Sequence, residues 1–480
     1  MKGKPLFPLF FIVLIALLVG GVFLSKKDFS KQTPITELET TYGKQLKDTI
    51  DSLSIVQDSI LIDLAPIEQL QIALQELDTD TTLAHGTFGF YLLDVESGQV
   101  IAKVNEEQSL VPASVMKIVN TGVAMSKMGK NYRFKTRLQY DGELDTVNHV
   151  LHGNIYIKGG GDPTLGSPVF KTHPNFVVRQ WAKAIEKLGI DSIQGGIIAD
   201  ARHFEYNMTP AGWAWGDMQN GYGVGVSGLS FVENTAKIII KRWTDGELSI
   251  YLVPKIPNLK IKNVMSKNLK GMKNHSYILG SPYGTEYFLK GGIRTDTQEF
   301  QDNIPIPDPA FLAASMLHSF LKKDSIFVRD SLTTIRKILL DSSYTDKERT
   351  TFHSIYSPPL KVLIQHTNLT SQNFYAETIL KELAVHNKSF GSTENGVKAV
   401  KKFLGGKGID LKGFYMTDGS GLSRFDGMTA KQLGEILLVF AKDSLHFDDF
   451  YSTLAVAGKT GTLKSIGKNT ILEGNLRAKS

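Results

Sequence analysis

The stretch Val111-Pro112-Ala113-Ser114-Val115-Met116-Lys117-Ile118-Val119 holds the pattern that decides how this chain is interpreted. It predicts a helix whose first turn carries Ser114, and the preceding Pro112 favours a sharp entry into that helix. A lysine three residues further on lies on the same helix face, so the Lys117 amine can reach the serine oxygen. A desolvated lysine with a lowered pKa can remove the serine proton. Ser114 and Lys117 are therefore candidates for a nucleophile and its base.

Spacing alone does not distinguish this pair, because Ser-x-x-Lys also occurs at Ser319/Lys322 and at Ser465/Lys468. Ser319 lies late in the apolar-periodic run 311–317, which predicts an ordinary amphipathic helix. Ser465 is followed by a Gly- and Lys-rich stretch of poor helix propensity. Only Ser114 opens a helix directly after two strand-like runs, which favours it as the functional serine.

Composition excludes several classes of site. The 480-residue chain is long enough for two or three domains. Its net charge of +6 is spread out, without the dense Lys/Arg runs typical of nucleic-acid binding, so we expect no nucleic-acid partner. The absence of cysteine excludes a disulfide, a thiol nucleophile and a lipoprotein anchor. The histidines show no metal-ligand spacing, and we expect neither a metal site nor a cofactor.

The N-terminus carries a mostly apolar run from Leu6 to Leu24 with lysines on both sides. As a helix it would be about 28 Å long, close to the thickness of a bilayer core. A secretory signal is the alternative, but the run is long for one and no clear cleavage site follows it. We expect residues 1–27 to be an uncleaved membrane signal-anchor. The helical periodicity of the next segment predicts a helical stalk at 28–82.

The rest of the chain divides by pattern. Two β-rich runs at 87–94 and 99–104 flank a Ser-Gly turn and predict a hairpin just before the Ser114 helix. From about residue 132 to about 350, short strands alternate with Gly turns and a few helices, and beyond 351 a helical pattern resumes. Gly159-Gly160-Gly161-Asp162-Pro163 lacks the ending of a phosphate loop and predicts a tight turn. Ser371-Gln372-Asn373 precedes an apolar helix and, taken alone, is typical of a helix cap.

Three motifs together suggest a family. Ser114-Val115-Met116-Lys117, Ser371-Gln372-Asn373 and a Lys-Ser/Thr pair near the C-terminus resemble the motifs of penicillin-recognising serine enzymes. A finer resemblance is to the D-alanyl-D-alanine carboxypeptidase/endopeptidase family that includes penicillin-binding protein 4. It extends in family order through Gly159-Gly160-Gly161-Asp162-Pro163-Thr164-Leu165, Trp213-Ala214-Trp215-Gly216-Asp217, Ser371-Gln372-Asn373-Phe374-Tyr375-Ala376-Glu377 and Asp418-Gly419-Ser420-Gly421-Leu422-Ser423-Arg424.

The resemblance implies an α+β fold. It has a penicillin-binding-protein/β-lactamase-like transpeptidase domain, with helices packed on an antiparallel sheet. That domain would comprise residues 83–131 and 351–480, separated by a large inserted β-rich domain at 132–350. The long separation between the first two motifs fits this family and argues against a β-lactamase.

The resemblance also implies roles for residues. Ser114 would attack the carbonyl of a D-Ala-D-Ala or cross-link peptide bond of peptidoglycan, with Lys117 as base. Ser371 would relay a proton between Lys117 and the leaving amine, and Asn373 would bind the substrate amide and hold Lys117. A lysine of the third motif would meet the substrate carboxylate. Penicillins would also acylate Ser114, which makes β-lactams inhibitors.

The implied setting is the cell envelope, with the anchor in the inner membrane and the body in the periplasm, facing peptidoglycan peptides. Two other functions remain open for the same fold. A non-catalytic β-lactam or muropeptide sensor would be acylated stably without turnover of a D-Ala-D-Ala peptide. A β-lactamase would hydrolyse penicillin quickly.

The third motif has two candidate lysines. Lys459-Thr460-Gly461 is the only complete Lys-Thr-Gly, but a polar, loop-like sequence follows it where an alternating strand is expected. In the family, a segment resembling residues 454–463 precedes the third motif, and the motif follows a stretch like 474–480. We therefore assign Lys479 and Ser480 to substrate binding, with the motif's glycine missing. We accordingly expect a C-terminally truncated chain, poorly folded or nearly inactive, whose hairpin at 87–104 keeps an unpaired edge.

Overall fold

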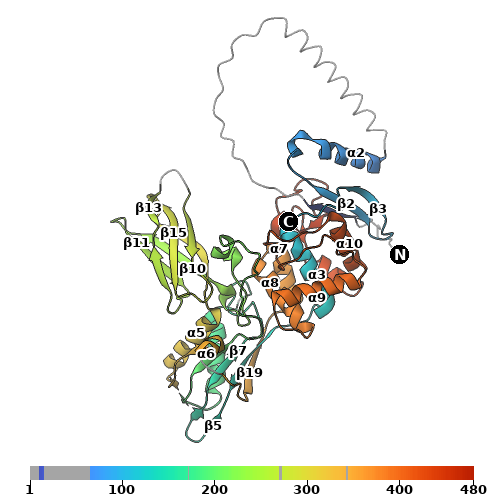
Figure 1. The fold of residues 1–480 in the computed structure, drawn as a ribbon. Coiled ribbons are helices and arrows are strands. Elements are labelled where there is room, and N and C mark those ends of the chain that lie inside the picture. The colour runs from blue at the N-terminus through green and yellow to red at the C-terminus, as the bar shows by residue number, and fades with distance from the viewer. Residues whose placement is uncertain (1–9, 16–64, 171, 270–272, 342–343, 480) are drawn as a thin grey trace, which may run out of the picture. The chain divides into compact units, whose positions relative to one another are not determined.

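The computed structural model describes residues 10–15, 65–170, 172–269, 273–341 and 344–479 (Figure 1). The chain divides into two compact units. Unit 1 comprises residues 1–110 and Met428–Leu438, and unit 2 comprises Val111–Gly427 and Val439–Ser480.

Unit 1 is built on an antiparallel sheet with the strand order β1-β2-β3. The central strand β2 is buried on both faces, because successive side chains of a strand point in opposite directions. Phe90 and Leu92 pack with Leu74, while Tyr91 and Leu93 pack with Ala430. The elements of unit 1 are β1 (Phe10–Ile15), α2 (Pro66–Thr79), η1 (Thr81–Leu83), β2 (Gly89–Asp94), β3 (Val100–Val104) and the first part of α10 (Ala430–Ala441).

The pairing of β1 with β2 corrects the expected unpaired edge of the hairpin. Phe10 lies opposite Asp94 and Ile15 opposite Gly89. The edge of β2 presents backbone donors and acceptors that need partners, and an aromatic, β-branched run is suited to supply them. These residues belong to the stretch predicted as a membrane helix, and the other residues of that stretch lie outside the described part of the chain.

The predicted stalk is described only from residue 65 onward. There α2 packs on the sheet of unit 1 through Leu70 and Leu74, which lie four residues apart on one helix face. Helix α2 is therefore part of unit 1, whereas residues 28–64 of the predicted stalk lie outside the described part of the chain. None of the helices in the described ranges is long and apolar enough to span a membrane.

The helical part of unit 2 surrounds α3 (Met116–Met128), in which ten of thirteen residues are buried. Helices α7, α8 and α9 all contact it, and Figure 1 shows these four helices gathered together. Gly122 of α3 allows the Phe440 ring to approach, since a Cβ there would lie 2.2 Å from that ring. The elements of this part are η2 (Ala113–Val115), α3, α7 (Leu360–Thr370), α8 (Asn373–His386), α9 (Thr393–Gly406), α11 (Phe447–Tyr451), β20 (Ala455–Val456), η6 (Gly461–Leu463) and β21 (Arg477–Ala478).

The predicted insertion begins and ends with two paired strands, β4 (Lys135–Tyr140) and β19 (Thr350–Tyr356). Its C-terminal boundary therefore lies a few residues beyond the predicted 350. The two strands belong to a sheet with the order β18-β9-β7-β4-β19. Further elements around this sheet are β7 (Ile155–Lys158), α4 (Pro174–Glu186), β9 (Ile197–Asp200), α5 (Pro309–Lys323), β18 (Thr333–Thr334) and α6 (Ile335–Asp341).

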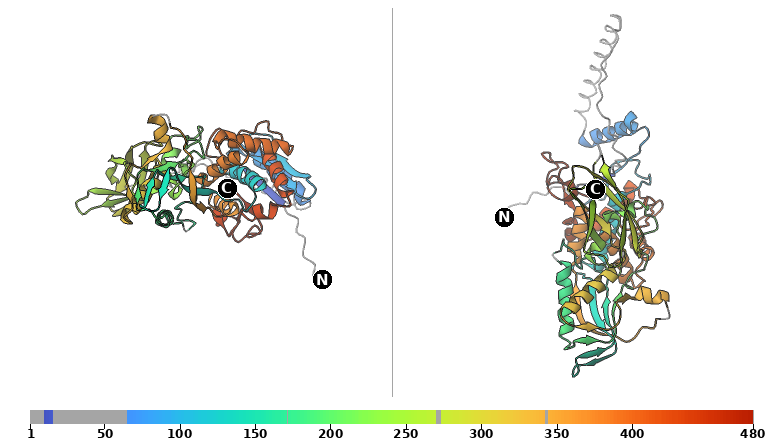
Figure 2. Two further views of the ribbon diagram at one scale, coloured as in Figure 1. Left: turned by 90° about the horizontal axis from the view of Figure 1, so that it is seen from below. Right: turned by 90° about the vertical axis from the view of Figure 1, so that its left-hand side faces the viewer.

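Three smaller sheets complete the insertion, with the orders β17-β8-β6-β5, β11-β10-β16 and β12-β15-β13, and with β14 also paired to β15. The left view of Figure 2 separates the yellow-green strands of this region from the orange helices of unit 2. The strands are β5 (Glu143–Asp145), β6 (Val150–His152), β8 (Ser192–Ile193), β10 (Thr235–Arg242), β11 (Leu248–Val253), β12 (Lys260–Asn263), β13 (Ser266–Leu269), β14 (His275–Leu279), β15 (Glu286–Arg294), β16 (Glu299–Pro305) and β17 (Phe327–Val328). Short 3₁₀ turns lie at η3 (Asp217–Gln219), η4 (Gly221–Gly223) and η5 (Val232–Asn234). The α+β class and the β-rich insertion are confirmed.

Candidate active site

Ser114 lies in the 3₁₀ turn η2, which leads directly into α3, so it precedes the helix by one short turn instead of opening it. Lys117 follows in the first turn of α3 and is fully buried. Its Nζ lies 3.0 Å from Ser114 Oγ and donates to the Ser420 carbonyl at 2.6 Å. Burial, and secondarily the charge of Lys479, lowers the pKa of Lys117 to about 7. A large fraction of this amine is therefore unprotonated at neutral pH and can accept the serine proton.

The Asp418–Ser423 loop supplies the carbonyl that holds Lys117. Asp418 shapes this loop, because its carboxylate accepts the backbone N–H groups of Ser420, Gly421 and Ser423 at 3.1, 2.6 and 2.8 Å. Gly421 has φ +73°, and a Cβ there would lie 1.7 Å from the Ala113 carbonyl. Only glycine fits where the loop presses on the turn that carries Ser114.

Ser371 and Lys479 form a second serine–lysine pair. Ser371 caps α7 in the left-handed conformation, with φ 58° and ψ 36°, and its Oγ accepts a hydrogen bond from Lys479 Nζ at 2.8 Å. Lys479 follows β21 directly and is 7% exposed. Burial lowers the pKa of Lys479 to about 8.

The two candidate lysines of the third motif have different surroundings. Lys459 is exposed in a turn, whereas Lys479 is buried and contacts Ser371. The geometry therefore favours Lys479 as the lysine of the third motif, in agreement with the prediction from the sequence. Ser480 lies outside the described residues, so its assignment to substrate binding stays a prediction.

Asn373 begins α8, and its side-chain amide donates to the Tyr222 carbonyl of the insertion at 3.0 Å. We expected Asn373 to hold Lys117, but the Ser420 carbonyl makes that contact. A second link from the insertion comes from Trp213, whose indole N–H donates to Asp418 at 2.7 Å. The Trp-Ala-Trp-Gly-Asp signature thus contacts the loop that holds Lys117.

The other Ser-x-x-Lys patterns have ordinary structural roles. Ser319 lies on the exposed side of α5, and its hydroxyl donates to the Ser315 carbonyl at 2.9 Å. Ser465 and Lys468 lie in a run of turns. Their context in the sequence had already separated them from Ser114.

Sequence reasoning missed Ser420, whose carbonyl accepts a hydrogen bond from Lys117, and Glu377, which contacts the same loop. Both lie inside stretches that resemble family signatures, and Glu377 is fully buried on α8 beside the Asp418–Ser423 loop. A glutamate inside the apolar stretch Phe374-Tyr375-Ala376-Glu377 is the signal that could have found it, since unpaired carboxylates are rarely buried.

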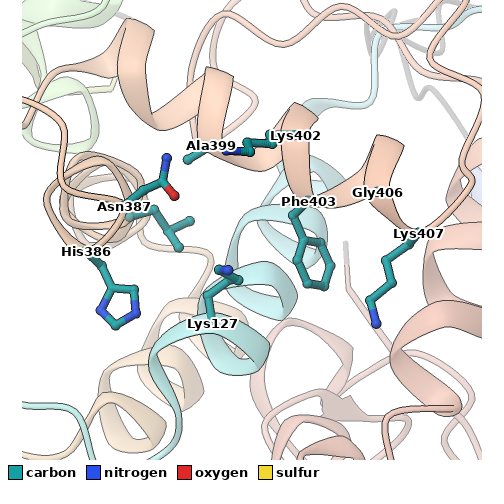
Figure 3. A pocket seen from close by; sticks show the side chains of 9 residues that line it. Lys127, His386, Asn387, Ala399, Lys402, Phe403, Gly406 and Lys407 are labelled. Carbon is teal, nitrogen blue, oxygen red and sulfur yellow. The ribbon is translucent and has the colours of Figure 1, made fainter.

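A separate hollow of about 430 Å³ lies among α3, α8 and α9 (Figure 3). Its basic residues include Lys127, His386 and Lys407, which lie in the last turn or at the C-terminal cap of these three helices. Cations there offset the partial negative charge of a helix C-terminus, which accounts for this cluster without a ligand. In the described ranges, acidic residues and histidines form no cluster of three suited to a metal ion.

The Ser114–Lys117 and Ser371–Lys479 pairs, held in an α+β fold, form the arrangement that a serine enzyme acting through an acyl intermediate requires. Residues 70–480 match the D-Ala-D-Ala carboxypeptidase 3 (S13) family. The chain therefore belongs to this family, and the prediction of a serine-type D-Ala-D-Ala carboxypeptidase is confirmed.

The individual relatives share only a low sequence identity with this chain. The chain is 22% identical over 429 residues to a D-alanyl-D-alanine carboxypeptidase of an Actinomadura species, covering 87% of this chain and 77% of the relative. It is 26% identical over 408 residues to penicillin-sensitive carboxypeptidase A of Dictyostelium discoideum, covering 79% and 73%. The crystal structure of penicillin binding protein 4 from Haemophilus influenzae matches with a TM-score of 0.70 at 21% identity, covering 82% of this chain and 83% of that one. This last likeness supports the fold.

Proposed function

We propose that this protein hydrolyses D-Ala-D-Ala or cross-link peptide bonds of peptidoglycan through an acyl-enzyme on Ser114. The observation that carries the proposal is the buried Lys117 amine, 3.0 Å from Ser114 Oγ and with a pKa of about 7. A serine hydroxyl needs such a base before it can attack a carbonyl at neutral pH.

Acylation begins when Ser114 Oγ attacks the carbonyl carbon of the scissile bond and its proton passes to Lys117. The tetrahedral intermediate collapses, the C–N bond breaks, and the leaving amine receives a proton by way of Lys117 and Ser371. This relay is supported by the presence of both serine–lysine pairs in one unit, where the charge of Lys479 is close enough to lower the pKa of Lys117.

Deacylation reverses the proton path. Water attacks the ester carbonyl, Lys117 accepts its proton, and Ser114 leaves with that proton restored. The products are the shortened peptide and the free amine, so atoms and charges balance without a cofactor.

Lys479 is our candidate for binding the carboxylate at the C-terminus of the substrate. A cation at this place attracts a carboxylate strongly because water is largely excluded there. Asn373, at the N-terminus of α8, is the candidate for the substrate amide. β-Lactams carry a similar carboxylate and carbonyl, and we propose that they acylate Ser114 as inhibitors.

Release of D-alanine from a peptide ending in D-Ala-D-Ala tests the proposal. The sequence alone predicted a nearly inactive chain, but both serine–lysine pairs are present in the structure. We therefore propose turnover by the unaltered chain, none by Ser114→Ala, and an unchanged rate for the matched control Ser319→Ala. Stable acylation by penicillin without D-alanine release would contradict hydrolysis and favour a sensor. Equal release by Ser114→Ala would contradict the assignment of the nucleophile.

We also propose that residues 1–27 are an uncleaved signal-anchor in the inner membrane and that the body lies in the periplasm. The support is the apolar run Leu6–Leu24 and the location of peptidoglycan. A segment that spans the membrane as a helix cannot at the same time form β1. The proposal of an anchor therefore requires that the membrane-inserted chain lacks the β1–β2 pairing. Retention of the chain in alkaline-washed membranes, and its release when residues 1–27 are removed, is the expected result. Recovery of the intact chain in the soluble fraction would contradict anchoring.

A further inference from the structure

A buried glutamate lies beneath the catalytic dyad, one helical turn beyond Asn373 on α8. Both carboxyl oxygens of Glu377 lie within hydrogen-bonding distance of the Gly419 backbone N–H, at 3.0 and 3.1 Å. The next residue, Ser420, presents its carbonyl to Lys117 Nζ at 2.6 Å. Glu377 therefore holds the backbone immediately before the group that holds the catalytic amine.

The same stretch of loop is fixed from two other directions. Asn120, one turn beyond Lys117 on α3, donates from Nδ2 to the Gly419 carbonyl at 3.3 Å and to the Ala376 carbonyl at 2.7 Å. Asp418 accepts the Ser420 N–H at 3.1 Å. Because the loop is held on both sides of Ser420, the direction of the Ser420 carbonyl is fixed. The position of the Lys117 amine, which donates to that carbonyl, is fixed as a result.

The protonation state of Glu377 suits this role. Burial, and secondarily the charge of Asp418, raises the pKa of Glu377 to about 8, while hydrogen bonds from Ser420 and Gly419 and the charge of Lys381 act in the opposite direction. Glu377 is thus mainly neutral at pH 7. Glu377 and Asp418 both act to raise the pKa of Lys117, against burial and the charge of Lys479. A largely neutral Glu377 limits this opposition to the lowered pKa of the base.

We propose that Glu377 is a positioning residue for the proposed acylation reaction. By accepting the Gly419 backbone N–H, Glu377 fixes the direction of the Ser420 carbonyl. That carbonyl in turn holds the Lys117 amine within hydrogen-bonding distance of Ser114 Oγ. Glu377 itself touches neither substrate nor the reacting atoms. The inference rests on the proposed function of Ser114 and adds a residue to which that function assigns no part.

Pre-steady-state acylation by a chromogenic cephalosporin tests the proposal, because the burst amplitude counts competent sites and the burst rate reports the chemistry in each. We expect Glu377→Ala to lower the limiting acylation rate at least tenfold, with the amplitude and the dissociation constant of the noncovalent complex changed less than twofold. Glu377→Gln should recover most of the rate, because its amide oxygen still accepts the Gly419 N–H. The matched control is Glu394→Gln, an exposed residue that pairs with Lys398 on α9.

A purely structural role would lower the amplitude of Glu377→Ala and leave the rate of the remaining sites unchanged, which would overturn the proposal. Unchanged rates in both variants would overturn it as well. If Glu377→Ala does not fold, the comparison moves to Glu377→Gln and Glu377→Asp, whose shorter side chain withdraws the carboxyl from Gly419. We expect the glutamine variant to be the faster of the two, and the reverse order would refute the inference. Absence of any burst in the unaltered chain would instead refute the proposed function and this inference with it.

Discussion

The acylation rate should follow a bell-shaped pH profile set by two lysines. Lys117 must be unprotonated to act as a base, and its pKa is about 7. About 1% of this amine is free at pH 5, about 9% at pH 6 and about half at pH 7, given a pKa of about 7. The rate should therefore rise about tenfold per pH unit on the acidic side and level off above pH 7.

Loss of the proton from Lys479 should produce the alkaline side of the profile. Lys479 must be protonated to bind a carboxylate, and burial lowers its pKa to about 8. The second-order acylation rate should fall as pH rises through about 8, because the cation is lost there. Lys479→Arg should move this side upward by at least one pH unit, since a guanidinium remains charged.

The assay is the second-order rate of labelling by a fluorescent penicillin between pH 5 and 10, after a check that the fold is intact by circular dichroism at each pH. A rate that is flat between pH 5.5 and 7.5 would refute Lys117 as a base with a lowered pKa. An alkaline side unaltered in Lys479→Arg would refute the assignment of that side to Lys479. Because the two lysines influence each other, the apparent values belong to the pair.

Three further substitutions test parts of the site. Trp213→Phe removes the donor to buried Asp418 and should lower the free energy of unfolding by about 1–3 kcal/mol, measured by urea denaturation. Gly421→Ala places a Cβ against a carbonyl at a positive φ and should lower acylation at least tenfold, whereas Gly406→Ala, with open space around it, should change it less than twofold. Ser371→Gly removes the proposed proton relay but suits the left-handed backbone, so acylation should fall at least tenfold while thermal melting shows no loss of stability. Equal losses for both glycine variants, or a rate unchanged in Ser371→Gly, would contradict these assignments.

Local patterns in the sequence predicted much of this architecture. The hairpin, the helix after Ser114 and the paired strands of the insertion follow from periodicity and turn residues, because burial of alternate or every third to fourth side chain shapes them directly. The short strands and few helices predicted between about 132 and 350 are present, for example as β11 and α4. The Ser114–Lys117 contact was also predictable, since both partners lie within one turn.

Contacts between distant segments were not predictable in this way. The Ser420 carbonyl reaches Lys117 from about 300 residues away, and a backbone carbonyl leaves no mark of its own in the sequence. Similarly, the hydrogen bonds of the Trp213 indole and the Asn373 amide depend on how the insertion packs against the rest of unit 2, which local sequence patterns do not predict. The pairing of β1 was missed because an apolar run of that length is typical of a membrane helix. In addition, sequence periodicity does not show which strand edge still needs a partner.

The identity of the acylated residue tests the central claim most directly. After reaction with a penicillin and digestion with trypsin, mass spectrometry of the peptide spanning residues 104–117 should show the acyl group on Ser114 and not on Ser109. The adduct should be absent in Ser114→Ala and retained in Ser319→Ala. Acylation at any other residue, or an adduct that persists in Ser114→Ala, would contradict the assignment of Ser114 as the nucleophile.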